Sequence, residues 1–132
     1  MSKTPDVPTS EEFTRTLGQV TFLLTISRPH LERPIAHIRD MVIAPLMLKQ
    51  VRVFLRGRQP VAALSWAYAS DEIRERVAKP PFVMGLPDWR SGPHVTVVEV
   101  ISPLLAPQMF IDQFLADAHA ARDRASTTGR PQ

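Results

Sequence analysis

Apolar positions at helical spacing open the chain. Phe13, Leu17, Val20 and Leu24 fall on one face of a helix. The pattern therefore predicts a helix over residues 10–26.

The start of this helix and the segment after it carry further signals. Thr9, followed three residues later by Glu12, matches the capping box that begins many helices. A second short helix is predicted from Pro34, because proline suits the first helical turn. Pro45 disfavours a long continuation of that helix, and the apolar residues within 40–48 allow a further strand there.

The pattern changes to a period of two in the middle of the chain. Segments 50–56 and 61–69 are predicted strands, and Gly57-Arg58-Gln59 is a predicted turn between them, so together they indicate a β-hairpin. Residues 94–101 are rich in β-branched side chains and predict a third strand.

Two helices are predicted on either side of the third strand. Ser70 can cap a helix over 70–78, and Pro107 begins a last helix with Phe110 and Phe114 on its apolar stripe. The order helix, helix, strand, strand, helix, strand, helix indicates an α+β fold, a sheet with helices packed against it.

Length and composition limit the domain organisation and the partners. The 132 residues are expected to form one domain over 9–125, with a disordered arm at 1–8 and a disordered tail at 126–132. The formal charge of +3 and the sequence pI of 10.0 are a mild basic bias. No concentrated basic stripe interleaved with aromatic residues is present, so no nucleic-acid partner is expected. An acidic protein partner fits the bias better.

Missing residue types and motifs exclude several kinds of site. The absence of cysteine excludes disulfides, thiolate zinc sites and a cysteine nucleophile, and it fits a cytoplasmic location. The first residues lack the apolar core of a signal peptide, and no apolar run approaches the roughly 20 residues of a membrane helix. The four histidines are too scattered for a metal site, and no glycine-rich phosphate loop is present. No metal and no bound cofactor are therefore expected.

Glu99 is the most informative single residue, because it interrupts the third apolar strand. Alternation along a strand places its side chain on the face of Val95, Val97 and Ile101. A carboxylate in such surroundings either has a charged partner or a raised pKa. Two interpretations follow, a functional carboxylate and a purely structural ion pair.

His30 is the candidate partner of Glu99. It lies in a loop between Pro29 and Pro34, which restrict the backbone. Histidine is the side chain best suited to proton transfer near neutral pH. A loop histidine without a catalytic role is the alternative. His119, in the polar last helix, is expected to be solvated.

Two other groups of residues have both a functional and a structural interpretation. The predicted hairpin carries a basic cluster, Lys49, Arg52, Arg56 and Arg58, in which Arg52 and Arg56 share one face of their strand. This cluster is either a solvated edge or a dock for an acidic partner. The two tryptophans, Trp66 and Trp89, are expected to pack in or beside the core rather than to contact a substrate.

Four short segments in collinear order resemble one known family, the toxin-activating lysine acyltransferases that accompany RTX toxins, also called hemolysin-activating proteins. The resemblance covers the chain from about Leu17 to Leu115. It is carried by Leu17-Gly18-Gln19-Val20 with Pro29-His30 and Pro34, by Pro60-Val61-Ala62 leading into Ser65-Trp66-Ala67, by Trp89-Arg90-Ser91-Gly92 with an acid seven residues later, and by Ile101-Ser102-Pro103.

The resemblance implies a specific reaction. Family members transfer a fatty acyl chain from acyl-acyl carrier protein to internal lysines of a protoxin, have a fold like the GCN5-related N-acetyltransferases and tend to form homodimers. Their catalytic histidine matches His30 and their catalytic aspartate matches Glu99. Arg52, Arg56 and Arg58 would then dock the acidic carrier protein. Backbone N–H groups at the Ser91-Gly92 turn are candidate oxyanion donors, since glycine allows close approach, and an ordinary turn is the alternative.

The chain departs from the family pattern in two respects. The acid is glutamate instead of aspartate, which moves the carboxylate by one methylene, and catalytic geometry tolerates misplacement poorly. Family members also continue with strand-forming sequence where this chain ends at Gln132. A fold truncated at its C-terminus is therefore expected, completed by dimerisation or belonging to an inactive relative. Two alternatives remain, a coenzyme-A-dependent N-acyltransferase acting on a small amine and a non-catalytic binding module of the same fold.

Overall fold

One antiparallel sheet of three strands forms the centre of the computed structural model, which describes residues 9–128. The strands lie in the order β1 (Val51–Arg56), β2 (Gln59–Ala69) and β3 (His94–Ile101). Gly57 adopts φ 63° in the hairpin turn between β1 and β2, a conformation that glycine adopts without strain. The predicted hairpin, third strand and α+β class are confirmed.

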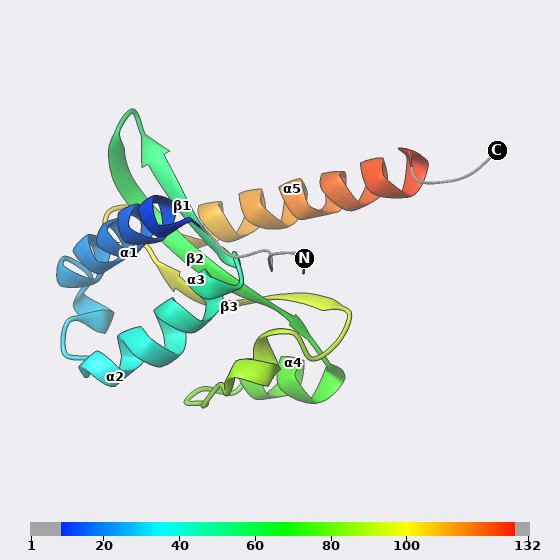
Figure 1. Cartoon of the computed structure of the whole chain (residues 1–132), viewed down its shortest axis with the longest axis horizontal. Coiled ribbons are helices and arrows are strands. Elements are labelled where there is room, and N and C mark those ends of the chain that lie inside the picture. The colour runs from blue at the N-terminus through cyan, green and yellow to red at the C-terminus, as the bar shows by residue number, and fades with distance from the viewer. Residues whose placement is uncertain (1–8, 129–132) are drawn as a thin grey trace, which may run out of the picture.

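One face of the sheet is covered by α1 (Ser10–Thr25), which crosses in front of the strands in Figure 1. The predicted capping box is present at its start, between Thr9 and Glu12. Its buried side chains pack against residues of β2 and β3 and form the first core cluster. That cluster consists of Val20, Leu23, Leu24, Val42, Ala63 and Ile101.

The opposite face is covered by α5 (Pro107–Thr128), whose C-terminal part extends well beyond the sheet (Figure 1). Phe110 and Phe114 pack on Phe54 and Leu64 in the second core cluster, as the apolar stripe of this helix predicts. The helix continues three residues past the predicted domain end at 125. The predicted arm at 1–8 and the last four residues of the predicted tail lie outside the described residues.

Residues 35–47 are helical throughout, so the strand predicted within 40–48 is wrong. The helix predicted from Pro34 is present as α2 (Ile35–Ile38), and it continues through a π-helical segment, η2 (Arg39–Ile43), into α3 (Ala44–Met47). Pro45 has no N–H to donate, and its ring would crowd the carbonyl four residues earlier in a regular α-helix. The wider π turn just before Pro45 relieves this conflict and lets the chain stay helical.

A third core cluster lies beside the last residues of β2. The predicted helix after Ser70 is present as α4 (Asp71–Val77), with the Ser70 hydroxyl accepting a hydrogen bond from the Ile73 N–H. Trp89, at the end of η3 (Leu86–Trp89), is fully buried there, and Trp66 packs beside the second cluster. No helix within residues 9–128 is long and apolar enough to cross a membrane.

Candidate active site

A β-bulge in β3 determines where Glu99 points. Glu99 pairs with Ser65 of β2, and the next pair along the ladder is Val97 with Trp66, so Val98 has no partner in the register. A bulge of this kind adds one residue to a strand and redirects the side chains beyond it.

The bulge corrects the predicted face of Glu99. Val95 and Val97 pack on the α5 side of the sheet, whereas Ile101 packs against α1. Glu99 lies on the α1 side with Ile101, because the extra residue reverses the alternation between Val97 and Glu99. The predicted grouping of Glu99 with Val95 and Val97 is therefore wrong, while its grouping with Ile101 is right.

Three basic side chains surround the Glu99 carboxylate. His30 Nε2 lies 3.2 Å from Oε2, and His37 Nε2 lies 2.7 Å from Oε1. Arg33 Nη1 is 3.5 Å from Oε2. The structure thus brings His30 and Glu99 into contact, and their catalytic role stays a prediction.

His30 is held on both sides of its ring. It ends the short 3-10 turn η1 (Arg28–His30), and its Nδ1 lies 2.7 Å from the hydroxyl oxygen of buried Ser27. In the neutral imidazole the Nε2 proton is donated to the ionised Glu99, and Nδ1 accepts a hydrogen bond from the Ser27 hydroxyl. In the imidazolium both nitrogens carry a proton, and Nδ1 donates to the Ser27 oxygen. Ser27, His30 and Glu99 form a hydrogen-bonded chain of hydroxyl, imidazole and carboxylate.

The carboxyl group of Glu99 favours its charged form. Burial alone would raise the pKa of Glu99, but the hydrogen bond with His30 and the charges of His37 and His30 outweigh burial and hold that pKa below its ordinary value. An ionised carboxylate beside an imidazole orients the ring and stabilises its cation.

His37 and Arg33 are members of the cluster that the sequence analysis missed. His37 comes from α2, and its side chain is as buried as that of His30, each being 7% exposed. No local sequence pattern marks His37, which lies seven residues after His30 in the helix that follows Pro34. Its Nδ1 is buried without a hydrogen-bond partner among the described residues.

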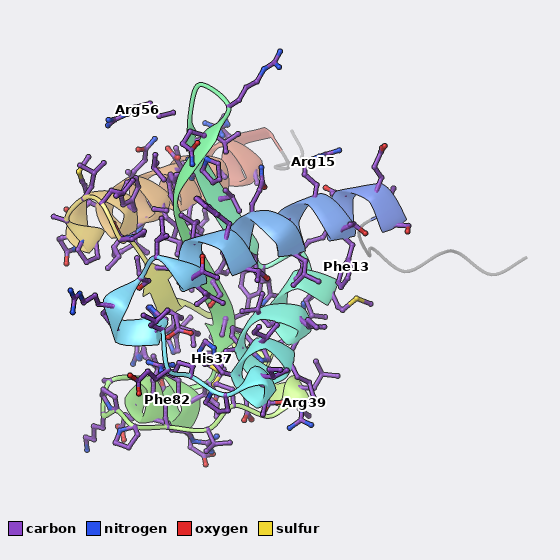
Figure 2. The ribbon with its side chains drawn as sticks, turned by 90° about the vertical axis from the view of Figure 1, so that its left-hand side faces the viewer. Phe13, Arg15, His37, Arg39, Arg56 and Phe82 are labelled. Carbon is purple, nitrogen blue, oxygen red and sulfur yellow. The ribbon has the colours of Figure 1, made fainter. Side chains whose placement is uncertain are left out.

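Two hollows meet at this cluster. A groove of about 700 Å³ has Arg33, His37 and Glu99 at its polar part and an apolar lining for the rest: Met41, Val77, Pro80, Pro81, Phe82, Val98 and Val100. Figure 2 labels His37 and Phe82, which reach this groove from α2 and from the loop after α4. A smaller hollow of about 140 Å³ is lined by His30, Arg33 and His37 together with residues of α1.

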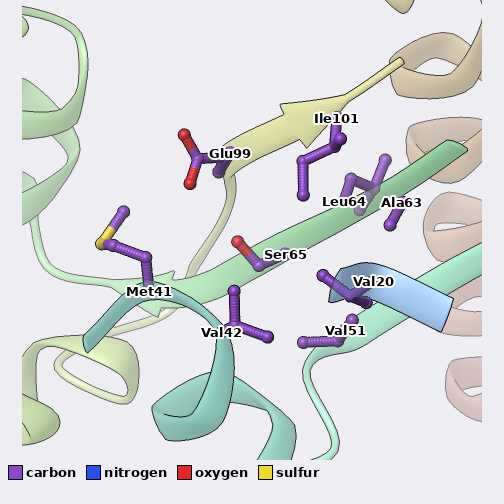
Figure 3. Close-up of a pocket in the computed structure, with 9 residues that line it drawn as sticks. All are labelled: Val20, Met41, Val42, Val51, Ala63, Leu64, Ser65, Glu99 and Ile101. Carbon is purple, nitrogen blue, oxygen red and sulfur yellow. The ribbon is translucent and has the colours of Figure 1, made fainter. Parts of the chain in front are cut away.

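A third, water-sized space lies beneath the carboxylate. Its volume is about 10 Å³, and its lining includes Glu99, Ser65 and Met41. Figure 3 shows the Glu99 and Ser65 side chains directed toward the same space. The Ser65 hydroxyl is buried without a partner among the described residues, so a single water molecule bridging it to Glu99 would satisfy it.

The predicted oxyanion turn has its donors in use elsewhere. The backbone N–H groups of Ser91 and Gly92 both donate to the Tyr68 carbonyl, at 2.7 and 3.0 Å. A Cβ at Gly92 would lie 2.5 Å from the Ser70 Cα, so glycine is required by close backbone packing. Neither residue lines a hollow that contains Glu99. The structure favours the turn interpretation.

The basic hairpin is divided between two environments. Arg52 pairs with Asp117 of α5 at 2.8 Å and lies over the Phe54 ring, so it already has an intramolecular role. Arg56 and Arg58 are exposed, and Figure 2 shows Arg56 beside the hairpin, well away from His37. The part of the cluster best placed for a partner is therefore Arg56 and Arg58.

Within residues 9–128, no group of three or more histidine, aspartate or glutamate side chains is arranged to hold a metal ion. The cluster around Glu99 contains one carboxylate and two imidazoles, and the positive charge of the Arg33 guanidinium would repel a metal cation. These residues are suited to proton transfer.

Comparison with known proteins places this geometry in context. The sequence matches the RTX toxin acyltransferase family (HlyC) over residues 9–128. It is also similar to the uncharacterized protein sll0720 of Synechocystis sp. (strain ATCC 27184 / PCC 6803 / Kazusa), with 21% identity over 99 residues that make up 74% of this chain and 67% of the relative.

Proposed function

Because the chain belongs to the RTX toxin acyltransferase family, we propose that it moves a fatty acyl group from acyl-acyl carrier protein to the side-chain amine of a lysine. The substrate is an RTX-type protoxin or a similar protein. The donor, the lysine acceptor, a cytoplasmic location and a homodimeric state are parts of this proposal. Membership itself identifies an acyltransferase-type protein that activates toxins.

The observation that supports the proposal most directly is the hydrogen-bonded chain from Ser27 through His30 to Glu99. His30 has the two contacts expected of a general base that is oriented by a carboxylate. Glu99 therefore makes the contact with the histidine that the family's aspartate is expected to make.

The reaction removes two protons from the lysine ammonium and supplies one to the leaving sulfur. The lysine ammonium first loses one proton to solvent, and the resulting amine attacks the thioester carbonyl of the acyl carrier. During this attack His30 takes a second proton from the amine nitrogen, at Nδ1, where the substrate nitrogen replaces the Ser27 hydroxyl as hydrogen-bond partner. Collapse of the tetrahedral intermediate forms the amide bond and breaks the carbon–sulfur bond. The thiolate that leaves takes a proton, which His30 can return as a general acid. Glu99 stabilises the imidazolium between these two steps.

The two hollows give each substrate a separate approach. The apolar lining of the larger groove suits an acyl chain, because each buried methylene contributes about 0.8 kcal/mol. The smaller hollow is lined by His30 and opens beside α1, which suits a lysine side chain. Arg33 and His37 line both, so donor and acceptor would meet at the carboxylate cluster.

His30→Ala tests the proposal. We expect single-turnover transfer from acyl carrier protein to fall about 10²–10⁴-fold, the usual contribution of general acid–base catalysis. His119→Ala, at an exposed position of α5, is the matched control and should leave the rate unchanged. Circular dichroism checks folding. A His30→Ala protein that is folded and within about threefold of the parent rate would contradict the assigned role.

Two donors and two acceptors distinguish the alternatives. Transfer from acyl coenzyme A to a small amine, at a higher rate than transfer from the carrier to a protein lysine, would support the small-amine acyltransferase instead. Carrier binding without turnover, in both the parent protein and His30→Ala, would support the non-catalytic binding module.

A further inference from the structure

Two histidines bind the Glu99 carboxylate, and the shorter contact comes from the one that the proposed reaction does not use. His37 Nε2 lies 2.7 Å from Oε1, whereas His30 Nε2 lies 3.2 Å from Oε2. We propose that His37 is a positioning residue for the transfer: it holds one oxygen of Glu99 so that the other faces His30. This inference rests on the proposed function of His30.

Glutamate needs such a support more than a shorter acid does. Its side chain has one more rotatable bond than aspartate, so an unsupported carboxylate would occupy several rotamers. The contact from Arg33 is longer, at 3.5 Å, and comes from a side chain that is 42% exposed. His37 supplies the short, buried contact, and it binds the oxygen that His30 leaves unused.

Packing alone does not explain a histidine at position 37. Its Nδ1 is buried without a partner among the described residues, and a buried unpaired nitrogen costs free energy. A leucine would fill similar space without that cost. The contact between His37 Nε2 and Glu99 offsets the free-energy cost of the unpaired Nδ1. This contact to the carboxylate therefore accounts for a histidine at position 37.

The charges around this contact come from few elements. Glu99 from β3 faces His30 from η1, Arg33 from the following loop and His37 from α2. Asp40 is close enough to His37 for the two charges to interact, and it is itself paired with Arg39. The groove wall formed by Val77, Pro80, Pro81 and Phe82 is apolar. The negative charge of Glu99 is therefore shared mainly among two imidazoles and one guanidinium.

Two variants separate positioning from space filling. His37→Leu keeps the volume and removes the N–H donor, and we expect kcat to fall by up to about 100-fold, the cost of misplacing a catalytic group by about 1 Å. The KM for the acyl carrier should change less than kcat. His37→Gln places an amide N–H where Nε2 was, so it should recover at least about tenfold of the loss. Equal rates for the Leu and Gln variants, both near the parent, would overturn the proposal.

The matched control is His94→Leu. His94 Nε2 also binds a carboxylate, Asp71 Oδ1 at 2.8 Å, but at an exposed site near the start of β3. This variant should leave kcat unchanged. In a Glu99→Asp background, which withdraws the carboxylate by one methylene, His37→Leu should add little further loss, because both changes remove the same contact. Fully additive losses would contradict a shared role.

A titration independent of activity completes the test. We expect the pKa of Glu99, followed by NMR of its carboxyl carbon, to rise in His37→Leu, because the charge of His37 contributes to lowering it. It should stay at the parent value in His94→Leu. If acyl transfer is not detected for the parent protein, this shift still tests the contact and the proposed function alone fails. An unshifted Glu99 titration in His37→Leu overturns the inference.

Discussion

At position 99 the charge and the length of the side chain have separate consequences. Glu99→Gln keeps the shape but removes the charge that stabilises the His30 cation, so we expect turnover per folded molecule to fall by about 10²–10⁴-fold. Glu99→Asp keeps the charge and should retain more activity than the Gln variant. Single-turnover rates, normalised to the folded fraction, test this order. Normal turnover by a folded Glu99→Gln protein would make the carboxylate a structural ion-pair partner.

The same residue predicts how stability depends on pH. The pKa of Glu99 is lower in the folded chain than its usual 4.5, so its ionised form stabilises the fold. That contribution is fully present above about pH 4.5 and is lost as the pH falls through the lower folded value. The melting temperature of the parent should therefore exceed that of Glu99→Gln most clearly near neutral pH, with a gap that shrinks below about pH 4. A constant gap from about pH 7 to pH 3 would contradict this linkage.

Among single residues, the sequence identified the two that the structure joins but not the two that complete the cluster. Glu99 was recognisable as a charge in an apolar strand, and His30 as the histidine between two prolines. Neither His37 nor Arg33 breaks a pattern in its own segment. Their importance comes from a contact made 62 residues away for His37, and local patterning does not contain such contacts.

At the scale of elements, the turn at Ser91 and Gly92 is predicted to be structural. In Gly92→Ala the added Cβ would lie within 2.7 Å of the backbone of Ala69 and Ser70, so we expect a loss of about 1–3 kcal/mol of stability. Turnover per folded molecule should be unchanged. Thermal unfolding and single-turnover assays measure the two quantities.

Gly18→Ala is the control, because its expected change in stability is opposite in sign to that of Gly92→Ala. A Cβ at Gly18 meets no atom within 4 Å, and alanine is favoured over glycine inside a helix by about 1 kcal/mol. This variant should be as stable as the parent or more stable. If Gly92→Ala keeps full stability and loses turnover, the turn returns as a candidate oxyanion site.

Helices and strands with a single clear hydrophobic periodicity could be predicted from the sequence. A segment whose residues favour both helix and strand could not. The hairpin, the capped helices α1 and α4, and the third strand each had agreeing signals. Residues 40–48 had a proline that argues against a helix and an apolar run that permits a strand. In the structure, a π turn before Pro45 lets this segment remain helical. The i, i+4 spacing of Val42 and Leu46 was the sequence evidence for a helix. The bulge at Val98 depends on pairing with β2 and has no sequence marker.

For the whole molecule, the prediction concerns the site of carrier docking. Arg56 and Arg58 are exposed on the hairpin, while Arg52 is paired with Asp117. Reversing Arg56 and Arg58 to Glu should weaken acyl carrier binding and reduce its dependence on salt, because exposed charges act through screened attraction. Calorimetric titration at two ionic strengths measures both effects.

Arg15→Glu provides the control for charge alone. Arg15 is exposed on α1, away from the hairpin, and its reversal changes the net charge without touching the proposed dock. Carrier affinity should fall much less than in the hairpin variant. Equal losses from both changes would mean that only the overall charge attracts the carrier, and an unchanged affinity in both would leave the hairpin arginines as a solvated edge.

The separation of the site residues along the chain bears on when activity can first exist during synthesis. Both histidines lie before the sheet, and Glu99 follows 69 residues after His30. A nascent polypeptide that has left the ribosome only as far as α4 contains both imidazoles and the hairpin but not Glu99, and it lacks most of the apolar lining of the groove. The proposed reaction needs Glu99, so we expect translation products that stop before β3 to be catalytically silent.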